Sequence, residues 1–373
     1  MYYLSRKIFS IIVIASLLVI MGTSINYFTT ITTIHSAYGQ AIQSRSDSNN
    51  TANANSLNIQ NIPAKKVHIV DIDIAYKTFG KGEPILLFNG ASDTMDNAWD
   101  PSFLKGLSSN HTVVVFDPRG IGNTTAGSKP YTMQLLASDA AGLMDALKIK
   151  QTNVLGYSLG SFTAQQFTVI YPDKVNRLIL VAATCGGKDN VPSPPEFKKL
   201  QSEIVNKSLH NIPVTREEMK SLSSASLGSG WIKLHPESVN IPTNITTMAQ
   251  LKPGLSPATM NNQNNVGLAW TAPNWSGACD ELAKVAKPTL VIAGTDDNNY
   301  VPHANALVIA GKIPGAWLVQ IKDAGHALMS QYPYKFNKVL QRFLSITTKI
   351  LLDKKIVIIY HHRTYVIRLG SFF

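Results

Sequence analysis

The segment "VLGYSLGSFTAQQF", residues 154–167, determines how the rest of the chain is interpreted. An apolar strand pattern changes into a helical pattern at Ser158, which stands between Gly156 and Gly160. Glycines on both sides let the strand and the helix approach closely, so that the serine hydroxyl projects above the sheet beside the positive end of the helix. A G-x-S-x-G pattern in this setting predicts a nucleophilic serine rather than an inert buried one.

A nucleophilic serine needs a base to remove its proton and an acid to orient that base. His326, in "IKDAGHALM", follows an apolar strand pattern and precedes the last long helix, which suits the base. The acid is expected in "VIAGTDDNNYVP", where another apolar run ends in two aspartates. Asp297 is the first choice, and Asp296 remains a rival because a one-residue assignment within such a pair is fragile.

The surrounding sequence alternates short apolar runs with helical segments. Continuous apolar runs of this length are typical of strands buried on both faces of a parallel sheet, and the alternation with helices predicts a doubly wound α/β fold. Period-two alternation over 67–80 predicts an antiparallel strand pair before that sheet. The predicted buried strands are 84–90, 111–117, 152–158, 177–184, 289–295 and 316–325.

Between residues 188 and 285 the strand signals stop and helical, proline-rich and Asn/Gln-rich stretches take their place. We interpret this part as a helical lid inserted at the edge of the sheet where the strands end and ligands bind. The expected organisation is a signal or anchor at 1–41, a flexible linker at 42–65, an α/β core in two parts at 66–187 and 286–348, the lid at 188–285, and a basic apolar tail at 349–373. No role is assigned to the tail, and a disordered or adventitious extension is its default interpretation.

The N-terminus has the pattern of an export signal. Arg6 and Lys7 precede the apolar run Ile8–Met21, and small residues lead up to a predicted cleavage site before Gln40. The run is shorter than the ~20 apolar residues that span a bilayer comfortably. An uncleaved membrane anchor extending through Ile25 is the alternative. Both interpretations predict that the remainder lies outside the cytoplasm, either secreted or tethered to the membrane.

The composition of the 373-residue chain, 45% hydrophobic and 15% charged, suits a globular protein with a sizeable core. Its formal net charge of +11 is gathered largely at the two ends, without the clustered basic helix or aromatic-interleaved patch of a nucleic-acid-binding protein. Nucleic acid is therefore not an expected partner.

The two cysteines are Cys185 and Cys279. In an exported protein they are able to pair, although two cysteines do not form a disulfide framework. Cys185 also fits the interpretation of a small buried apolar residue at the end of a strand. With no CxxC or HExxH pattern, no metal site is expected.

Five motifs follow one another in a familiar order: "FNGASDTMDNAW", "FDPRGIGNTT", "GYSLGS", "GTDD" and "DAGH". Residues from about 66 to 346 resemble the α/β-hydrolase fold family, in the branch with a helical lid. The first motif resembles the family's oxyanion loop, the second its D-x-R-G turn and the third its nucleophile elbow. The order serine, aspartate, histidine along the chain is also that of this family.

The resemblance implies roles for further residues. The backbone N–H groups of Ala91 and Leu159 would be the oxyanion donors, while Trp99 and Tyr157 are candidates for the lining of an acyl pocket. Asp117 and Arg119, in the D-x-R-G turn, are expected to be structural.

This sequence departs from the family pattern in two places. Asn89 stands where the family usually has histidine, a position that mainly shapes the oxyanion loop. The stretch from Asp297 to Pro302 is one residue longer than is usual, which keeps the choice between the two aspartates open.

The function implied is that of a cofactor-independent serine hydrolase that cleaves an ester or related small-molecule acyl compound through an acyl-enzyme. Serine at the elbow separates this chain from family members that carry aspartate there to dehalogenate or to open epoxides. An aminopeptidase or amidase is an alternative, with an acidic lid residue such as Glu203, Glu217 or Glu218 holding a substrate amine. A ligand-binding sensor that turns over slowly is another.

Overall fold

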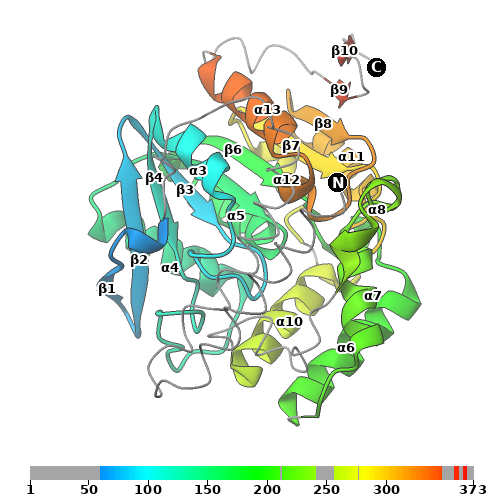
Figure 1. Cartoon of the computed structure of the whole chain (residues 1–373). Helices are drawn as coiled ribbons and strands as arrows, with labels where there is room; N and C mark the ends of the chain where they lie inside the picture. Colours follow the sequence, from blue (N-terminus) through cyan, green and yellow to red (C-terminus); the bar gives the residue numbers. More distant parts are fainter. Residues whose placement is uncertain are drawn as a thin grey trace, which may run out of the picture. The chain divides into compact units, whose positions relative to one another are not determined.

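The computed structural model describes residues 59–210, 212–240, 256–275 and 277–346, together with the backbone of residues 357–360 and 364–367. A mixed β-sheet runs through the described part of the chain, with helices on both faces (Figure 1). The predicted signal or anchor at 1–41 and most of the 42–65 linker lie outside the described residues, so export stays a prediction. Among the helices that the structure describes, none has the length and apolar character needed to cross a membrane.

The strand order is β1-β2-β4-β3-β5-β6-β7-β8-β9-β10. The predicted antiparallel pair is confirmed as β1 and β2, while β3 to β8 correspond to the predicted apolar runs and pair in parallel with one another. The strands up to β8 are β1 (Lys65–Ile69), β2 (Ile72–Gly80), β3 (Glu83–Phe88), β4 (His111–Phe116), β5 (Thr152–Tyr157), β6 (Val175–Val181), β7 (Thr289–Gly294) and β8 (Trp317–Ile321). The expected doubly wound, mostly parallel α/β fold is thus confirmed.

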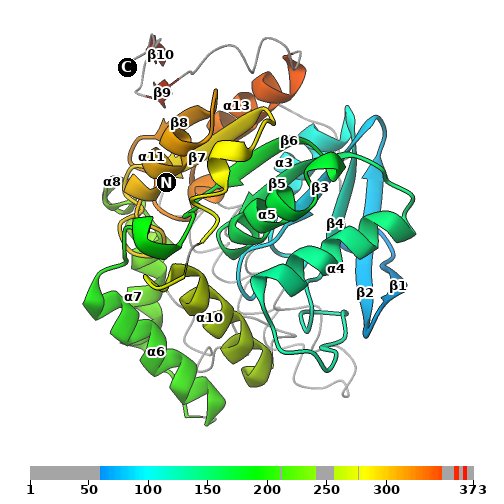
Figure 2. The same ribbon diagram turned by 180° about the vertical axis from the view of Figure 1, so that it is seen from behind.

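Two layers of helices enclose the sheet. Helices α3 (Pro101–Ser108), α12 (Leu328–Gln331) and α13 (Pro333–Ser345) cover one face. Helices α4 (Met133–Ala146), α5 (Leu159–Ile170) and α11 (Ala304–Lys312) cover the other, as Figure 2 shows from behind. Each face has its own apolar core. Since a fully buried aliphatic or aromatic side chain contributes about 1.5–3 kcal/mol, these two cores hold the carboxyl ends of the strands in fixed positions.

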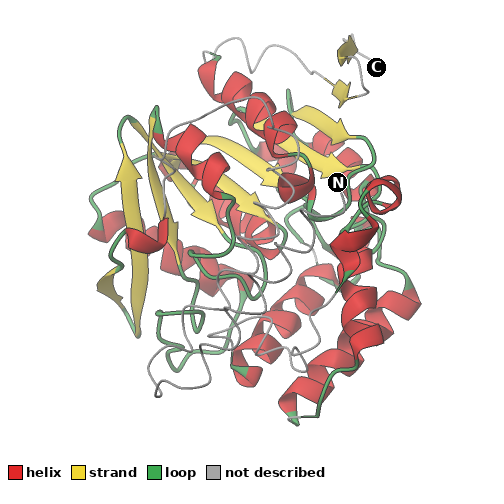
Figure 3. Cartoon of the chain, viewed as in Figure 1, coloured by secondary structure: helices red, strands yellow, loops and turns green. Residues whose placement is uncertain are grey.

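The chain between β6 and β7 forms helices and no strand in its described residues (Figure 3). Its helices are α6 (Pro195–Leu209), α7 (Arg216–Ser226), α8 (Ser229–Leu234) and α10 (Pro257–Thr271). We call this part the insertion. Short 3₁₀ turns complete the described elements: η1 (Ile59–Asn61), η2 (Pro172–Lys174), η3 (Gly187–Asp189), η4 (Pro236–Val239) and η5 (Leu282–Lys284).

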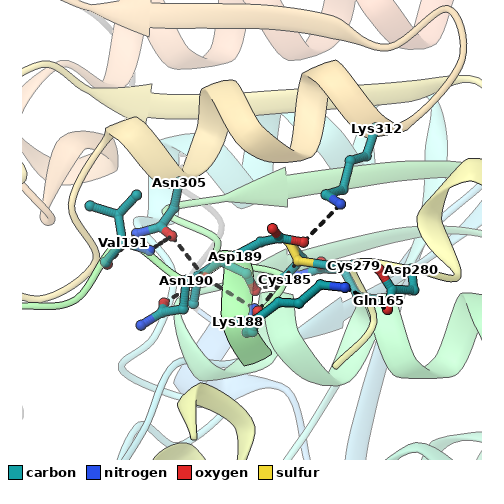
Figure 4. Close-up of a disulfide and its surroundings, with 12 residues drawn as sticks. Gln165, Cys185, Lys188, Asp189, Asn190, Val191, Cys279, Asp280, Asn305 and Lys312 are labelled. Carbon is teal, nitrogen blue, oxygen red and sulfur yellow. Dashed lines mark hydrogen bonds and ion pairs between the residues drawn. A yellow bond between two sulfur atoms is a disulfide. The ribbon is translucent and has the colours of Figure 1, made fainter. Parts of the chain in front are cut away.

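A disulfide between Cys185 and Cys279 closes the insertion at its base (Figure 4). Their Cα atoms are 4.9 Å apart although 94 positions separate them in the sequence. Ion pairs flank the bond, from Lys312 to Asp189 at 2.8 Å and from Lys188 to Asp280 at 3.5 Å. Linking a loop of this size removes chain entropy from the unfolded state, worth about 4–5 kcal/mol. The sequence left open whether Cys185 and Cys279 pair, and the structure shows that they do.

The C-terminal segment contains structure that the sequence analysis did not predict. Strand β9 (Val357–Tyr360) pairs in parallel with β8, and β10 (Thr364–Ile367) pairs antiparallel with β9. The default of a disordered extension was therefore wrong for these residues. The run is short and follows the last long helix of the core, so no strand–helix alternation marks it as part of the sheet.

Arg119 is buried between two carboxylates. Its guanidinium donates to Asp139 at 2.7 and 2.9 Å and to Asp71 at 2.9 Å through each of two nitrogens. Nearby, Asp117 accepts the backbone N–H groups of Met95 at 2.7 Å and Asn123 at 2.8 Å. Asp117 thus ties the turn after β4 to the loop after β3, while Arg119 ties the same turn to α4 and to the turn between β1 and β2, which agrees with the structural role expected for both residues.

Arg119→Leu is expected to destabilise the fold by about 3–5 kcal/mol, because it leaves two carboxylates without their buried cation. Urea denaturation of the variant, followed by circular dichroism, measures the loss. Arg342→Leu, on the exposed side of α13, is the matched control and is expected to unfold like the parent. A midpoint for Arg119→Leu equal to that of the control would contradict a structural role for Arg119.

Candidate active site

Ser158 occupies a sharp turn between β5 and α5. Its backbone has φ 53° and ψ −124°, a strained conformation for a residue with a side chain. A Cβ added at Gly156 would lie 2.3 Å from the carbonyl oxygen of Gly160, and one added at Gly160 would lie 2.1 Å from that of Phe88. Only glycine fits at both positions, so the G-x-S-x-G spacing is what allows the serine to stand at this corner.

Ser158, His326 and Asp297 form a continuous chain of hydrogen bonds. The Nε2 atom of His326 lies 2.9 Å from the Oγ atom of Ser158, and its Nδ1 atom lies 2.7 Å from Oδ2 of Asp297. The three residues follow β5, β8 and β7, at the carboxyl edge of the parallel sheet. Asp297 is fully buried and His326 is 6% exposed, so water competes little for these bonds. This geometry suits proton transfer from the hydroxyl to the imidazole.

The two neighbouring aspartates have different partners. The second carboxylate oxygen of Asp297 accepts the backbone N–H of Val301 at 3.2 Å, which fixes the carboxylate beneath the histidine. The carboxylate of Asp296 instead accepts from the hydroxyl of Ser229 at 2.9 Å and from the backbone N–H of Gly230 at 3.3 Å. Asp296 thus holds the start of α8, and only Asp297 of the pair contacts the imidazole.

The loop after β3 is held from two sides. The side-chain amide of Asn89 donates to the carbonyl of Phe116 at 3.0 Å, and its oxygen accepts from the Trp99 indole N–H at 2.7 Å. From the insertion, Gln263 of α10 accepts the backbone N–H of Ser92 at 2.7 Å. Asn89 thereby performs the loop-shaping role expected of the residue at its position.

The proposed oxyanion donors lie on either side of the Ser158 turn. Ala91 belongs to the loop that Asn89 and Gln263 hold. Leu159 is the first residue of α5, where the helix itself offers no acceptor for the backbone N–H. Their use as donors remains a proposal that rests on this placement.

The two candidates for the acyl pocket occupy different surroundings. Trp99 is 4% exposed, packs against Phe103 in the core and donates to Asn89, so its contacts support the oxyanion loop. Tyr157 is half-buried beside His326, with its ring 5.3 Å from the imidazole and its hydroxyl donating to the His326 carbonyl at 3.2 Å. Burial raises the pKa of the Tyr157 phenol well above its usual value, so this group stays neutral.

Two residues near the site were not singled out from the sequence. Gln263 was hidden in a polar run without a motif, and no local signal pointed to its contact with Ser92. Tyr300 stacks on His326, with ring centroids 4.8 Å apart and an interplanar angle of 18°. In the sequence Tyr300 lies between Asp297 and Pro302, in a turn whose Asp and Asn residues gave no sign of this contact. Burial raises the pKa of the Tyr300 phenol, and the nearby Asp297 raises it further.

Within the described ranges, no three His, Cys, Asp or Glu side chains are arranged to hold a metal ion. A small cavity of about 20 Å³ is lined in part by Asn89, Leu159 and Gln263. That volume suffices for about one water molecule.

The sequence model of the alpha/beta hydrolase fold matches residues 83–332. The chain belongs to this family. The alpha/beta hydrolase match spans the oxyanion loop, the serine turn, the insertion and the histidine loop, and it confirms the resemblance inferred from the motifs.

Among alpha/beta hydrolase relatives, the chain is similar to a poly(3-hydroxyalkanoate) depolymerase of Ectopseudomonas oleovorans. The two are 30% identical over 266 residues, which cover 70% of this chain and 84% of the depolymerase. Two solved structures share the fold at lower identity. MGS-M2, an alpha/beta hydrolase from a Medee basin deep-sea metagenome library, is 19% identical with a TM-score of 0.62, over 76% of this chain and 98% of its own. Est816, described as an N-acyl homoserine lactone degrading enzyme, is 23% identical with a TM-score of 0.58, over 75% and 100%.

Proposed function

We propose that this alpha/beta hydrolase is a serine esterase that cleaves a carboxylic ester or a related acyl compound through an acyl-enzyme. The observation that carries the proposal is the hydrogen-bonded chain from Ser158 through His326 to Asp297. In this arrangement one group is the nucleophile, the second a base within reach of the hydroxyl proton, and the third an anion that orients the base.

The reaction follows from these positions in two halves. The Oγ atom of Ser158 attacks the carbonyl carbon while Nε2 of His326 takes the hydroxyl proton. The backbone N–H groups of Ala91 and Leu159 stabilise the negative charge that develops on the carbonyl oxygen. The C–O bond to the leaving alcohol then breaks as His326 returns the proton to it. Water attacks the acyl-Ser158 ester with His326 again as base, which releases the carboxylic acid and restores the serine.

All the groups needed for these steps belong to the chain: a nucleophile, a proton carrier and fixed hydrogen-bond donors. We therefore propose that the reaction requires no cofactor and that the partner is a small-molecule or polymer-derived acyl substrate. The similarity to a poly(3-hydroxyalkanoate) depolymerase supports an aliphatic ester, including esters of 3-hydroxy acids, as the substrate class.

The contacts of the insertion favour an ester over a peptide with a free amine. Glu218 is paired with Lys207 at 2.7 Å and also caps the start of α7. Glu203 lies 3.8 Å from Lys199 on the same helix. Glu217 is exposed on α7. Two of the three acids considered for holding a substrate amine therefore serve the insertion itself.

Turnover of p-nitrophenyl esters of graded acyl length, including a 3-hydroxyacyl ester, tests this proposal on the full-length protein. We expect a burst of p-nitrophenol followed by steady turnover, because acylation and deacylation are separate steps. The matched p-nitroanilides are expected to react more slowly, since the amine is the poorer leaving group. Release of a single equivalent without turnover would identify a sensor, and a preference for anilides with a free amine would identify an aminopeptidase.

A further inference from the structure

Tyr300 contacts the face of the proposed base. His326 is held at both ring nitrogens by hydrogen bonds, and the N–H bond and the lone pair that form such bonds point along the plane of an imidazole. Two such bonds fix the position of the ring but not its tilt about the line between the nitrogens. The ring of Tyr157 lies 5.3 Å away at 37°, a more distant and more inclined contact than that of Tyr300. Tyr300, stacked at 4.8 Å and 18°, supplies a contact on the face of the ring that restrains this tilt.

Tyr300, in the loop after β7, also contacts several parts of the insertion. Phe197 of α6 packs against its ring edge-on, with centroids 4.7 Å apart. The hydroxyl of Ser193 donates to its backbone carbonyl at 3.1 Å, and its own hydroxyl donates to the carbonyl of Leu222 in α7 at 3.4 Å. Tyr300 therefore lies between the insertion and His326.

The hydrogen bonds of the loop after Asp297 fix the place of this tyrosine. Asp297 closes the loop on itself, because its carboxylate accepts from the N–H of Val301 at 3.2 Å and its carbonyl accepts from that of His303 at 2.7 Å. Tyr300 directly precedes Val301 and is thereby fixed relative to the carboxylate that orients His326.

We propose that Tyr300 is a positioning residue that sets the tilt of His326 and couples it to the insertion, a role that rests on the proposed esterase function. A substrate that seats beneath the insertion and shifts α6 or α7 would move Tyr300, and through it the imidazole. The alignment of the base then depends on how well the acyl group fits the insertion.

The test compares Tyr300→Phe with Tyr300→Leu in the full-length protein, using a short p-nitrophenyl ester. Phenylalanine keeps the ring and loses one long hydrogen bond, so kcat is expected to stay within about threefold of the parent. Leucine removes the flat ring, and a misaligned base is expected to lower kcat about 100-fold with KM little changed. Tyr334→Leu, at a tyrosine 76% exposed on α13, is the control and is expected to behave like the parent. If the leucine variant does not fold, Tyr300→Met tests the same loss of the ring.

A second readout does not depend on activity. In the proposed mechanism Nδ1 of His326 carries the proton that bridges to Asp297, and this proton is expected to give a downfield NMR signal, assigned by its absence from His326→Gln. We expect the signal to persist in Tyr300→Phe and to broaden or vanish in Tyr300→Leu. Unchanged kcat in the leucine variant overturns the proposal, and so does a lower kcat with an unchanged signal, which would assign Tyr300 to substrate binding. If the parent hydrolyses no ester, the proposed function fails while the NMR comparison still decides the role of Tyr300.

Discussion

Ser158→Ala is expected to lower kcat for ester hydrolysis by about 10⁶-fold, the scale seen when the nucleophile of a comparable triad is removed. The reason is that His326 has no other hydroxyl at hydrogen-bond distance on its Nε2 side among the contacts described. Alanine fits the turn without a new contact, so the fold is expected to persist. Residual turnover would come from the oxyanion donors and from substrate binding alone.

Covalent labelling by a fluorophosphonate measures the same loss directly, because the probe reacts with an activated serine. Ser161→Ala is the matched control. Its hydroxyl lies one helical turn away, is fully buried and donates to the Ser158 carbonyl at 2.6 Å. The control is expected to label like the parent, with a loss of stability of about 1 kcal/mol. Labelling of Ser158→Ala at the parental rate would mean that another residue is the nucleophile.

The fold was predictable because its signals are local. Each buried strand is a short apolar run that ends in glycine or polar residues, and a helix of the right period follows it. The serine turn was predictable for a similar reason, since the G-x-S-x-G pattern lies within one segment and Gly156 is required by the backbone of Gly160, although Gly160 itself is required by the distant backbone of Phe88. The strands β9 and β10 lacked such signals, because their short apolar runs do not alternate with a helical pattern in the sequence.

Parts of the site depend on contacts between residues far apart in the sequence. Trp99 was a pocket candidate by its place in a motif, yet its indole lies in the core and supports Asn89. Gln263 contacts Ser92 across 171 positions, and Cys185 meets Cys279 across 94. A pattern within one segment does not reveal such pairs, because they arise only when the insertion folds back over the edge of the sheet.

The choice between Asp296 and Asp297 could not be made from the sequence for the same reason, because it depends on which carboxylate reaches the distant His326. Asp297→Asn is expected to lower kcat about 10⁴-fold, the scale seen when a triad aspartate is made neutral. An amide in place of the carboxylate no longer stabilises the imidazolium, and its NH₂ group presents a donor to Nδ1 and so favours the wrong tautomer of His326. The cost appears in kcat and in kcat/KM alike, because the lost interaction belongs to the transition state.

Asp296→Asn is the matched control, since it makes the same chemical change one residue away. The asparagine oxygen still accepts from Ser229 and Gly230, so the start of α8 keeps at least part of its support. The loss is expected to be about 1 kcal/mol of stability and less than about tenfold in kcat, because the two hydrogen bonds are weakened rather than removed and the imidazole is untouched. Circular dichroism of both variants excludes unfolding as the cause of any difference.

A reversed order of the two activities would move the acid to Asp296 and leave the nucleophile and the base in place. Equal, near-parental activities would instead show that neither carboxylate orients His326, and the mechanism proposed from this hydrogen-bonded chain would then fail at its third member.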